Sequence, residues 1–127
     1  MKILRIILLF IAVLCVSELS AQTFKCVDVE FHDNSLSQSR KYEIKMRGLG
    51  GKIKISVFKN SLKIEDLSTD SNPMILDKVN DNQYLYTKSN GNKTVVKLNT
   101  ILGYIRGLEI IGYIDGKMVG KTIFERD

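Results

Sequence analysis

Basic side chains crowd one short segment of the chain. Eight lie between residues 40 and 63, where Glu43 is the only acid. Residues 42–47 and 52–57 both alternate apolar and polar residues, and the glycine-rich residues 48–51 separate them, which predicts a β-hairpin. The outer face of that hairpin would gather Lys45, Arg47, Lys52 and Lys54.

Like charges across a strand pair repel one another, so an anionic partner would relieve them. We therefore predict an anion-binding face for an anionic glycan, a lipid head group or a partner protein. The alternative is a solvated face whose lysines protect a sheet edge from pairing. Proteins that bind single-stranded nucleic acid usually stack several aromatic rings on the bases. Phe58 is the only aromatic residue on this face, which argues against nucleic acid as a partner.

A second pattern resembles a calcium-binding loop. Oxygen-bearing side chains recur between residues 66 and 77 at the spacing that calcium loops use. The pattern departs from such loops because Ser71 replaces the turn glycine and a shorter Asp ends the segment. The alternative is a turn whose polar side chains bond their own backbone. The candidate metal ligands are Asp66, Ser68, Asp70 and Asp77.

Two smaller groups of side chains are further candidates. His32 and Asp33 follow a strand that carries Asp28 and Glu30 on its outer face, a set that could hold a metal but lacks a second nitrogen or sulfur ligand. Tyrosines in the second half of the chain could line a cavity, or instead fill the core and its rim. The candidate cavity residues are Tyr84, Tyr86, Tyr104 and Tyr113.

The chain is poor in catalytic residue types. It has one histidine, two cysteines and no tryptophan, and it contains no glycine-rich phosphate loop. A nucleophile, a base and an orienting group would have few possible members. We therefore predict a protein that is not an enzyme and that needs no cofactor.

The elements that must position these side chains are strands. From Gln22 onward, short segments alternate apolar and polar residues, with turn signals about every ten residues. Asn90-Gly91 and Asp115-Gly116 are strong hairpin signals. No segment has a convincing helical period. We predict an antiparallel meander of about eight or nine strands, curled into a small barrel or a two-sheet sandwich.

The first 21 residues have the pattern of a secretory signal peptide. A basic start precedes an apolar run over residues 6–16 and a small-residue exit ending at Ala21. This predicts export to the periplasm, the cell surface or the medium; the alternatives are a retained anchor or a lipoprotein through Cys15. Cleavage would leave one domain, residues 22–127, with 17 basic and 13 acidic side chains, a net charge of +4, and Cys26 as its only cysteine. We expect Cys26 to be buried or to pair with another chain.

The chain also resembles a known group of proteins. The features are the leader ending Ser20-Ala21-Gln22, the following Thr23-Phe24-Lys25-Cys26, and the final strand ending Phe124-Glu125-Arg126. In these it is similar to small exported all-β proteins common in Bacteroidota. The resemblance implies export and an all-β fold. It implies no reaction, because those proteins mostly lack an assigned activity.

Two functions follow as expectations. One is an exported, non-catalytic binding module that presents the basic hairpin to an anionic partner. The other is a lipocalin-like carrier that holds a small apolar ligand inside a barrel. The expected interior residues, such as Val29, Ile55 and Val96, are mostly medium-sized and branched, which favours a filled interior. The oligomeric state has no signal in the sequence.

Overall fold

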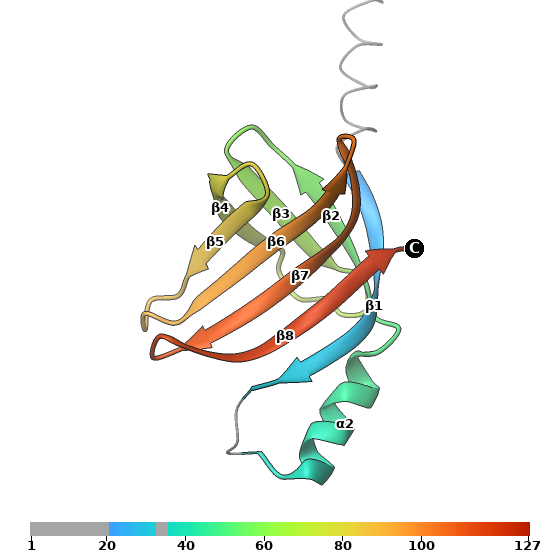
Figure 1. Ribbon diagram of the computed structural model, residues 1–127, viewed down its shortest axis with the longest axis vertical. Helices are drawn as coiled ribbons and strands as arrows, with labels where there is room; N and C mark the ends of the chain where they lie inside the picture. The colour runs from blue at the N-terminus through green and yellow to red at the C-terminus, as the bar shows by residue number, and fades with distance from the viewer. Residues whose placement is uncertain (1–20, 33–35) are drawn as a thin grey trace, which may run out of the picture.

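The computed structural model describes residues 21–32 and 36–127. Eight antiparallel strands form a closed barrel in which each strand pairs with the next and β8 pairs with β1 (Figure 1). The all-β meander predicted from the sequence is confirmed, and it is a barrel rather than a sandwich. The strands are β1 (Ala21–Phe31), β2 (Lys52–Val57), β3 (Ser61–Asp66), β4 (Met74–Asn80), β5 (Gln83–Thr87), β6 (Lys93–Ile101), β7 (Tyr104–Ile114) and β8 (Lys117–Arg126).

The barrel core comes from alternate residues of every strand. Because side chains of a strand point to opposite faces in turn, the inward positions follow from the register. Phe24 lies opposite Ile53 across β1 and β2, and Leu108 lies opposite Phe124 across β7 and β8. The most completely buried side chains are Phe24, Ile55, Leu62, Leu76, Tyr84, Val96 and Leu108.

A β-bulge in β1 changes which of its side chains face the core. The register of β1 against β8 shifts between Cys26 and Asp28, so Val27 falls in a bulge and is exposed. A strictly regular alternation would place Val27 on the same face as Val29 and Phe31, and the bulge prevents this. Beyond the bulge, Asp28 and Glu30 lie opposite Ile123 and Lys121 on the outer face of β8.

Residues 38–48 form a helix, α2 (Gln38–Gly48), where the sequence predicted a strand. The Ser37 side chain caps its start by accepting a hydrogen bond from the Arg40 backbone N–H, at 3.2 Å. Glu43 pairs with Arg40 and Arg47 at helical spacing. Without a strand here, the predicted basic hairpin does not exist.

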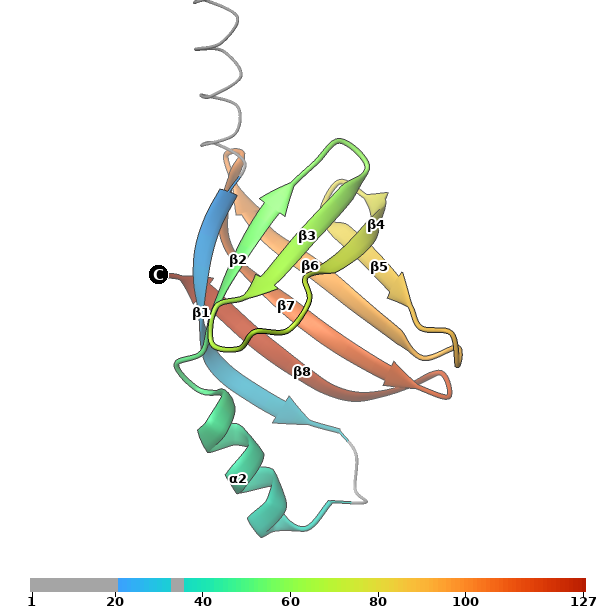
Figure 2. The same ribbon diagram turned by 180° about the vertical axis from the view of Figure 1, so that it is seen from behind.

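The helix lies at one end of the barrel, beside the second half of β1 (Figures 1 and 2). No α2 residue is buried. Within residues 21–32 and 36–127, none of the helical segments has both the length and the apolar character to cross a membrane. The signal peptide predicted for residues 1–21 lies outside the described residues, except that Ala21 begins β1.

Candidate functional site: a hollow on the outer wall

The four cations predicted to share one face are dispersed. Three have carboxylate partners: Lys45 pairs with Asp28 at 3.0 Å, Arg47 with Glu43 at 2.8 Å, and Lys52 with Asp127 at 2.9 Å. Lys54 lies on the outer face of β2, opposite Glu65 of β3. The hairpin expectation failed because two of the four belong to α2. That any of them binds an anion stays a prediction.

The predicted calcium ligands are also apart. Asp66 ends β3 and accepts a hydrogen bond from the Ser68 backbone N–H at 2.8 Å, as a polar turn would. Asp77 lies opposite Ser61, at the other end of β3. No group of three or more metal-ligating side chains occurs in the part of the chain that the structure describes. Asp70 lies in the exposed β3–β4 connection.

The histidine corner and the tyrosines take separate positions as well. The Nε2 atom of His32 lies 3.9 Å from Oε2 of Glu30, and Asp33 lies outside the described residues. Tyr84 is a core residue, whereas Tyr86 and Tyr104 are exposed. Tyr113 pairs with Lys93 and Met118 on the outer face, so the four tyrosines do not line one cavity.

A hollow of about 920 Å³ lies on the outer wall formed by β6, β7 and β8. Two outward-facing rows cross these strands: Asn99, Gly107 and Glu125 form one, and Lys97, Glu109 and Ile123 form the other. The first row has no side chain at its centre, because Gly107 stands there. We call this site the Gly107 hollow. Its polar rim comprises Lys97, Asn99, Arg106, Glu109, Glu125 and Arg126.

The backbone itself requires glycine at the centre of the hollow. The register of β6 against β7 shifts between Asn99 and Thr100, which leaves Arg106 in a bulge beside Gly107. A Cβ atom at position 107 would lie 2.6 Å from the carbonyl oxygen of Phe124, far closer than carbon and oxygen can approach. The close approach of β7 to β8 thus leaves no room for a side chain at position 107.

The rim of the hollow carries an excess of available positive charge. Within the described residues, Lys97, Arg106 and Arg126 have no carboxylate within 4.0 Å. The carboxylate of Glu109, by contrast, is already engaged, since its Oε1 lies 3.4 Å from Nζ of Lys121. Three cations are therefore available to meet a ligand.

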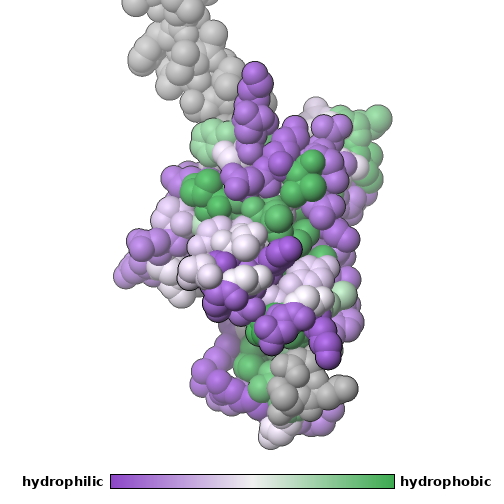
Figure 3. Space-filling view, turned by 90° about the vertical axis from the view of Figure 1, so that its left-hand side faces the viewer, coloured by the Kyte–Doolittle hydropathy of each residue, from purple (hydrophilic) through white to green (hydrophobic). Residues whose placement is uncertain are grey.

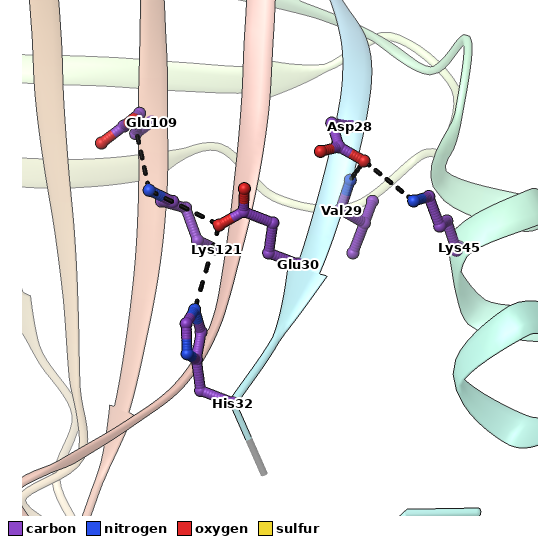
Figure 4. Close-up of polar contacts among 7 residues, drawn as sticks. All are labelled: Asp28, Val29, Glu30, His32, Lys45, Glu109 and Lys121. Atoms are coloured by element: carbon purple, nitrogen blue, oxygen red, sulfur yellow. Dashed lines mark hydrogen bonds and ion pairs between the residues drawn. The ribbon is translucent and has the colours of Figure 1, made fainter. Parts of the chain in front are cut away.

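Lys121 links the hollow to the first strand. Figure 4 shows its Nζ between the carboxylates of Glu109 and Glu30, the latter at 3.6 Å. These two negative charges, Glu109 first, raise the pKa of Lys121, which therefore keeps its charge. The cluster thus gives Glu109 a partner that is not one of the three rim cations, although Lys97 lies opposite it across β6 and β7.

Sequence reasoning missed the hollow because its residues lie between positions 97 and 126 and come together only through strand register. The one local signal was Gly107 inside an otherwise apolar segment. A glycine within a strand indicates a bulge or a close backbone approach, and the glycines at positions 103, 107 and 112 all fit that interpretation equally well. Only the structure shows which of these glycines opens a cavity.

A second, smaller recess of about 470 Å³ lies on the outer wall beside the β5–β6 and β7–β8 turns, to which Gly91 and Gly116 belong. Leu85 and Val95 face each other on its floor, and Tyr113 and Lys93 stand beside it. Val95 and its neighbour Ile111 are buried although both point away from the core. Hydrophobic groups also break the hydrophilic surface on the side of the barrel seen in Figure 3.

The interior is less well filled at the end near α2. Inward-facing Val29, Phe31, Ile110 and Thr122 are only partly buried there, and Tyr86 is 37% exposed. At the opposite end, inward residues such as Phe24 and Ile55 are fully buried. The barrel is thus packed in one half and partly open in the other.

The chain matches no protein-family model, no curated protein and no solved structure. Of the two cavities described, the Gly107 hollow is the larger and the more highly charged.

Proposed function

We propose that this domain is an exported, non-catalytic binding module that takes an anionic ligand in the Gly107 hollow. The observation that carries the proposal is the set of three cations, Lys97, Arg106 and Arg126, which border a cavity and have no carboxylate partner among the described residues. Other cations, such as Lys25, Lys54 and Lys88, also have no carboxylate partner among the described residues, but they do not line the hollow.

The chemistry of the rim suits an oxyanion carried on a polar body. Arginine offers a planar fork of donors that matches carboxylate, sulfate or phosphate oxygens. Asn99 and Glu125 can accept hydrogen bonds from ligand hydroxyls. A sulfated or uronic-acid glycan and a phosphorylated head group share this chemistry.

The residues around the hollow do not suggest catalysis. They include no histidine, cysteine or serine, so the usual nucleophile and base are absent from its described lining. The carboxylate of Glu109 is engaged by Lys121, whose Nζ lies 3.4 Å from its Oε1. A binding role is the simplest use of such a site.

The test is retention of the domain, residues 22–127, on immobilised heparin as salt rises. Charge-driven binding weakens with salt because counterions screen it. A variant with Lys97, Arg106 and Arg126 changed to Glu should elute at much lower salt than the unchanged protein. The matched control changes Lys41, Lys88 and Lys117 to Glu, which alters the net charge equally but away from the hollow.

The control decides the result. If it keeps most of the retention, the hollow is the binding site. If both variants lose retention equally, binding follows net charge and the proposal is wrong. Retention that ignores salt would also overturn it.

One observation favours a second function, that of a carrier. The partly open half of the interior near α2 could admit a small apolar ligand. Binding of a neutral fluorescent probe such as Nile red should then be lost when inward-facing Thr94 is changed to Trp, and should survive the three changes in the hollow. No binding by the unchanged protein would exclude the carrier.

A further inference from the structure

The hairpin joining β6 and β7 projects beyond the rest of the barrel wall. β5 pairs with β6 only as far as Lys97, and β8 pairs with β7 only from Gly107 onward. The segment Asn99–Arg106 therefore has no outer strand neighbour among the described residues. Figure 1 shows it rising at the end of the barrel opposite α2, and we call it the projecting hairpin.

Its tip is unusually apolar for a solvated turn. Leu102 is 94% exposed, Tyr104 is 67% exposed and Ile101 is 46% exposed. The base is firmly anchored, because Ile105 is buried in the core. A rigid base thus holds three large apolar side chains in water.

The backbone of the tip makes the leucine more unusual. Leu102 and Gly103 have φ angles of 52° and 80°, and Asp115 and Gly116, in the β7–β8 turn, have 50° and 76°. The two turns are alike, but the second uses the residue type that tolerates a positive φ. Leu102 therefore combines a strained backbone conformation with an apolar side chain that is exposed to water. Such an outlier points to a role for its side chain outside the fold.

Three cations lie toward the same end of the barrel as the tip. Arg106 ends the projecting hairpin, and Arg126 lies where β8 stops. Lys59 and the exposed Phe58 occupy the β2–β3 turn at the same end of the barrel (Figures 1 and 2). Among the described residues, these three cations have no carboxylate within 4.0 Å.

We propose that the projecting hairpin inserts Leu102 and Tyr104 into the surface of an anionic lipid bilayer. Apolar and aromatic side chains enter the interface, while arginine and lysine reach the phosphates. Anionic lipid adds attraction for each nearby cation. The inference shares Arg106 and Arg126 with the Gly107 hollow, but it depends on the apolar tip and stands if the hollow binds nothing.

The chain has no tryptophan, so a single one can report on the tip. In a Leu102→Trp variant of residues 22–127, vesicles of phosphatidylcholine and phosphatidylglycerol should shift the emission to shorter wavelength. Lipids brominated in their acyl chains should quench it. The matched control is Leu67→Trp, which replaces another exposed leucine, in the β3–β4 connection at the other end of the barrel, and should show neither change.

Vesicle sedimentation of the protein without tryptophan gives the second measurement. Leu102→Asn combined with Tyr104→Ser should weaken binding about tenfold or more, because the buried apolar area is lost. Asn suits the turn, so folding is preserved. Vesicles of phosphatidylcholine alone should bind more weakly than the anionic ones.

The outcomes separate the two proposals. If the protein sediments with anionic vesicles but the emission of the Leu102→Trp variant stays unchanged, charge alone holds it and the insertion is wrong. If neither vesicle binds, the insertion is also wrong, whatever the heparin result. If heparin shifts the emission of this variant as vesicles do, the tip contacts polyanions in general and lipid insertion is overturned.

Discussion

Asp28 of β1 and Lys45 of α2 are joined by an ion pair, with Oδ1 of the first 3.0 Å from Nζ of the second (Figure 4). The same carboxylate accepts a hydrogen bond from the Val29 backbone N–H at 2.9 Å. The bond from Lys45, and then that from Val29, lowers the pKa of Asp28 below its ordinary value. One side chain thus ties an exposed helix to a bulged strand.

We expect Asp28→Asn to loosen α2 without unfolding the barrel. Amide hydrogen exchange in residues 38–48 should become faster, while exchange in β6 and β7 stays unchanged. Glu65→Gln, which removes the ion pair with Lys63 on the wall, is the control and should leave α2 unaffected. Equal exchange in α2 for both variants would mean that the ion pair does not hold the helix.

The same ion pair predicts a dependence on pH. A carboxyl group whose pKa is lowered by folding stabilises the folded contact above its unfolded pKa, and that contribution disappears as the pH falls through the folded value. The amide hydrogen-exchange protection factors of α2, which correct for the intrinsic exchange rate, should therefore decrease at acidic pH in the unchanged protein. In Asp28→Asn they should depend less on pH.

Leu102→Asn should stabilise the domain by about 1 kcal/mol, because Asn tolerates a positive φ better than Leu does. The reverse change in the matching turn, Asp115→Leu, should destabilise it by a similar amount. Urea unfolding of both variants measures this. A Leu102→Asn variant that is less stable would mean that the leucine side chain serves the fold.

Gly107→Ala should destabilise the domain by about 1–3 kcal/mol, since the new methyl group meets the backbone oxygen of Phe124 rather than a flexible side chain. Gly112→Ala on the same strand is the control, because its Cβ would find only an ordinary contact with Val119 at 3.6 Å. Thermal unfolding should separate the two variants. Equal melting temperatures would show that β7 shifts freely at Gly107.

The thiol of Cys26 should react slowly. Its side chain is buried, and burial raises its pKa, so little thiolate reaches solvent. In residues 22–127, Cys26 is the only cysteine, and a coloured disulfide reagent should label it only when the protein unfolds. Rapid labelling of the folded protein would contradict the buried position of Cys26. It would instead favour the alternative that Cys26 pairs with a cysteine of another chain.

The strands were predictable because the residues that fill the barrel repeat every second position. Ile53 and Ile55 on β2 show this, as do Val96 and Leu98 on β6. The helix was not, because Tyr42, Ile44 and Met46 also alternate, and local alternation outweighed the cap at Ser37 and the Glu43 pairs. A short exposed helix has little apolar periodicity to reveal it.

The candidate site was less predictable than the fold. The Gly107 hollow depends on which residues of β6, β7 and β8 face one another, and a register shift between Asn99 and Thr100 borders it. The basic cluster around residue 45 was conspicuous in the sequence, but most of its cations have partners in the structure. The sequence shows where basic residues cluster along the chain. Only the pairing of the strands shows which of these side chains lack a carboxylate partner.

Barrel closure also bears on how the chain is made. Phe24 of β1 pairs with Arg126 of β8, so the first strand of the barrel to be synthesised completes its pairing with the last. Until β8 exists, one edge of β1 has no partner, and contacts between such distant residues form slowly because a long loop must close. The growing chain therefore cannot close its barrel before β8 has been made, and until then it stays in an open form.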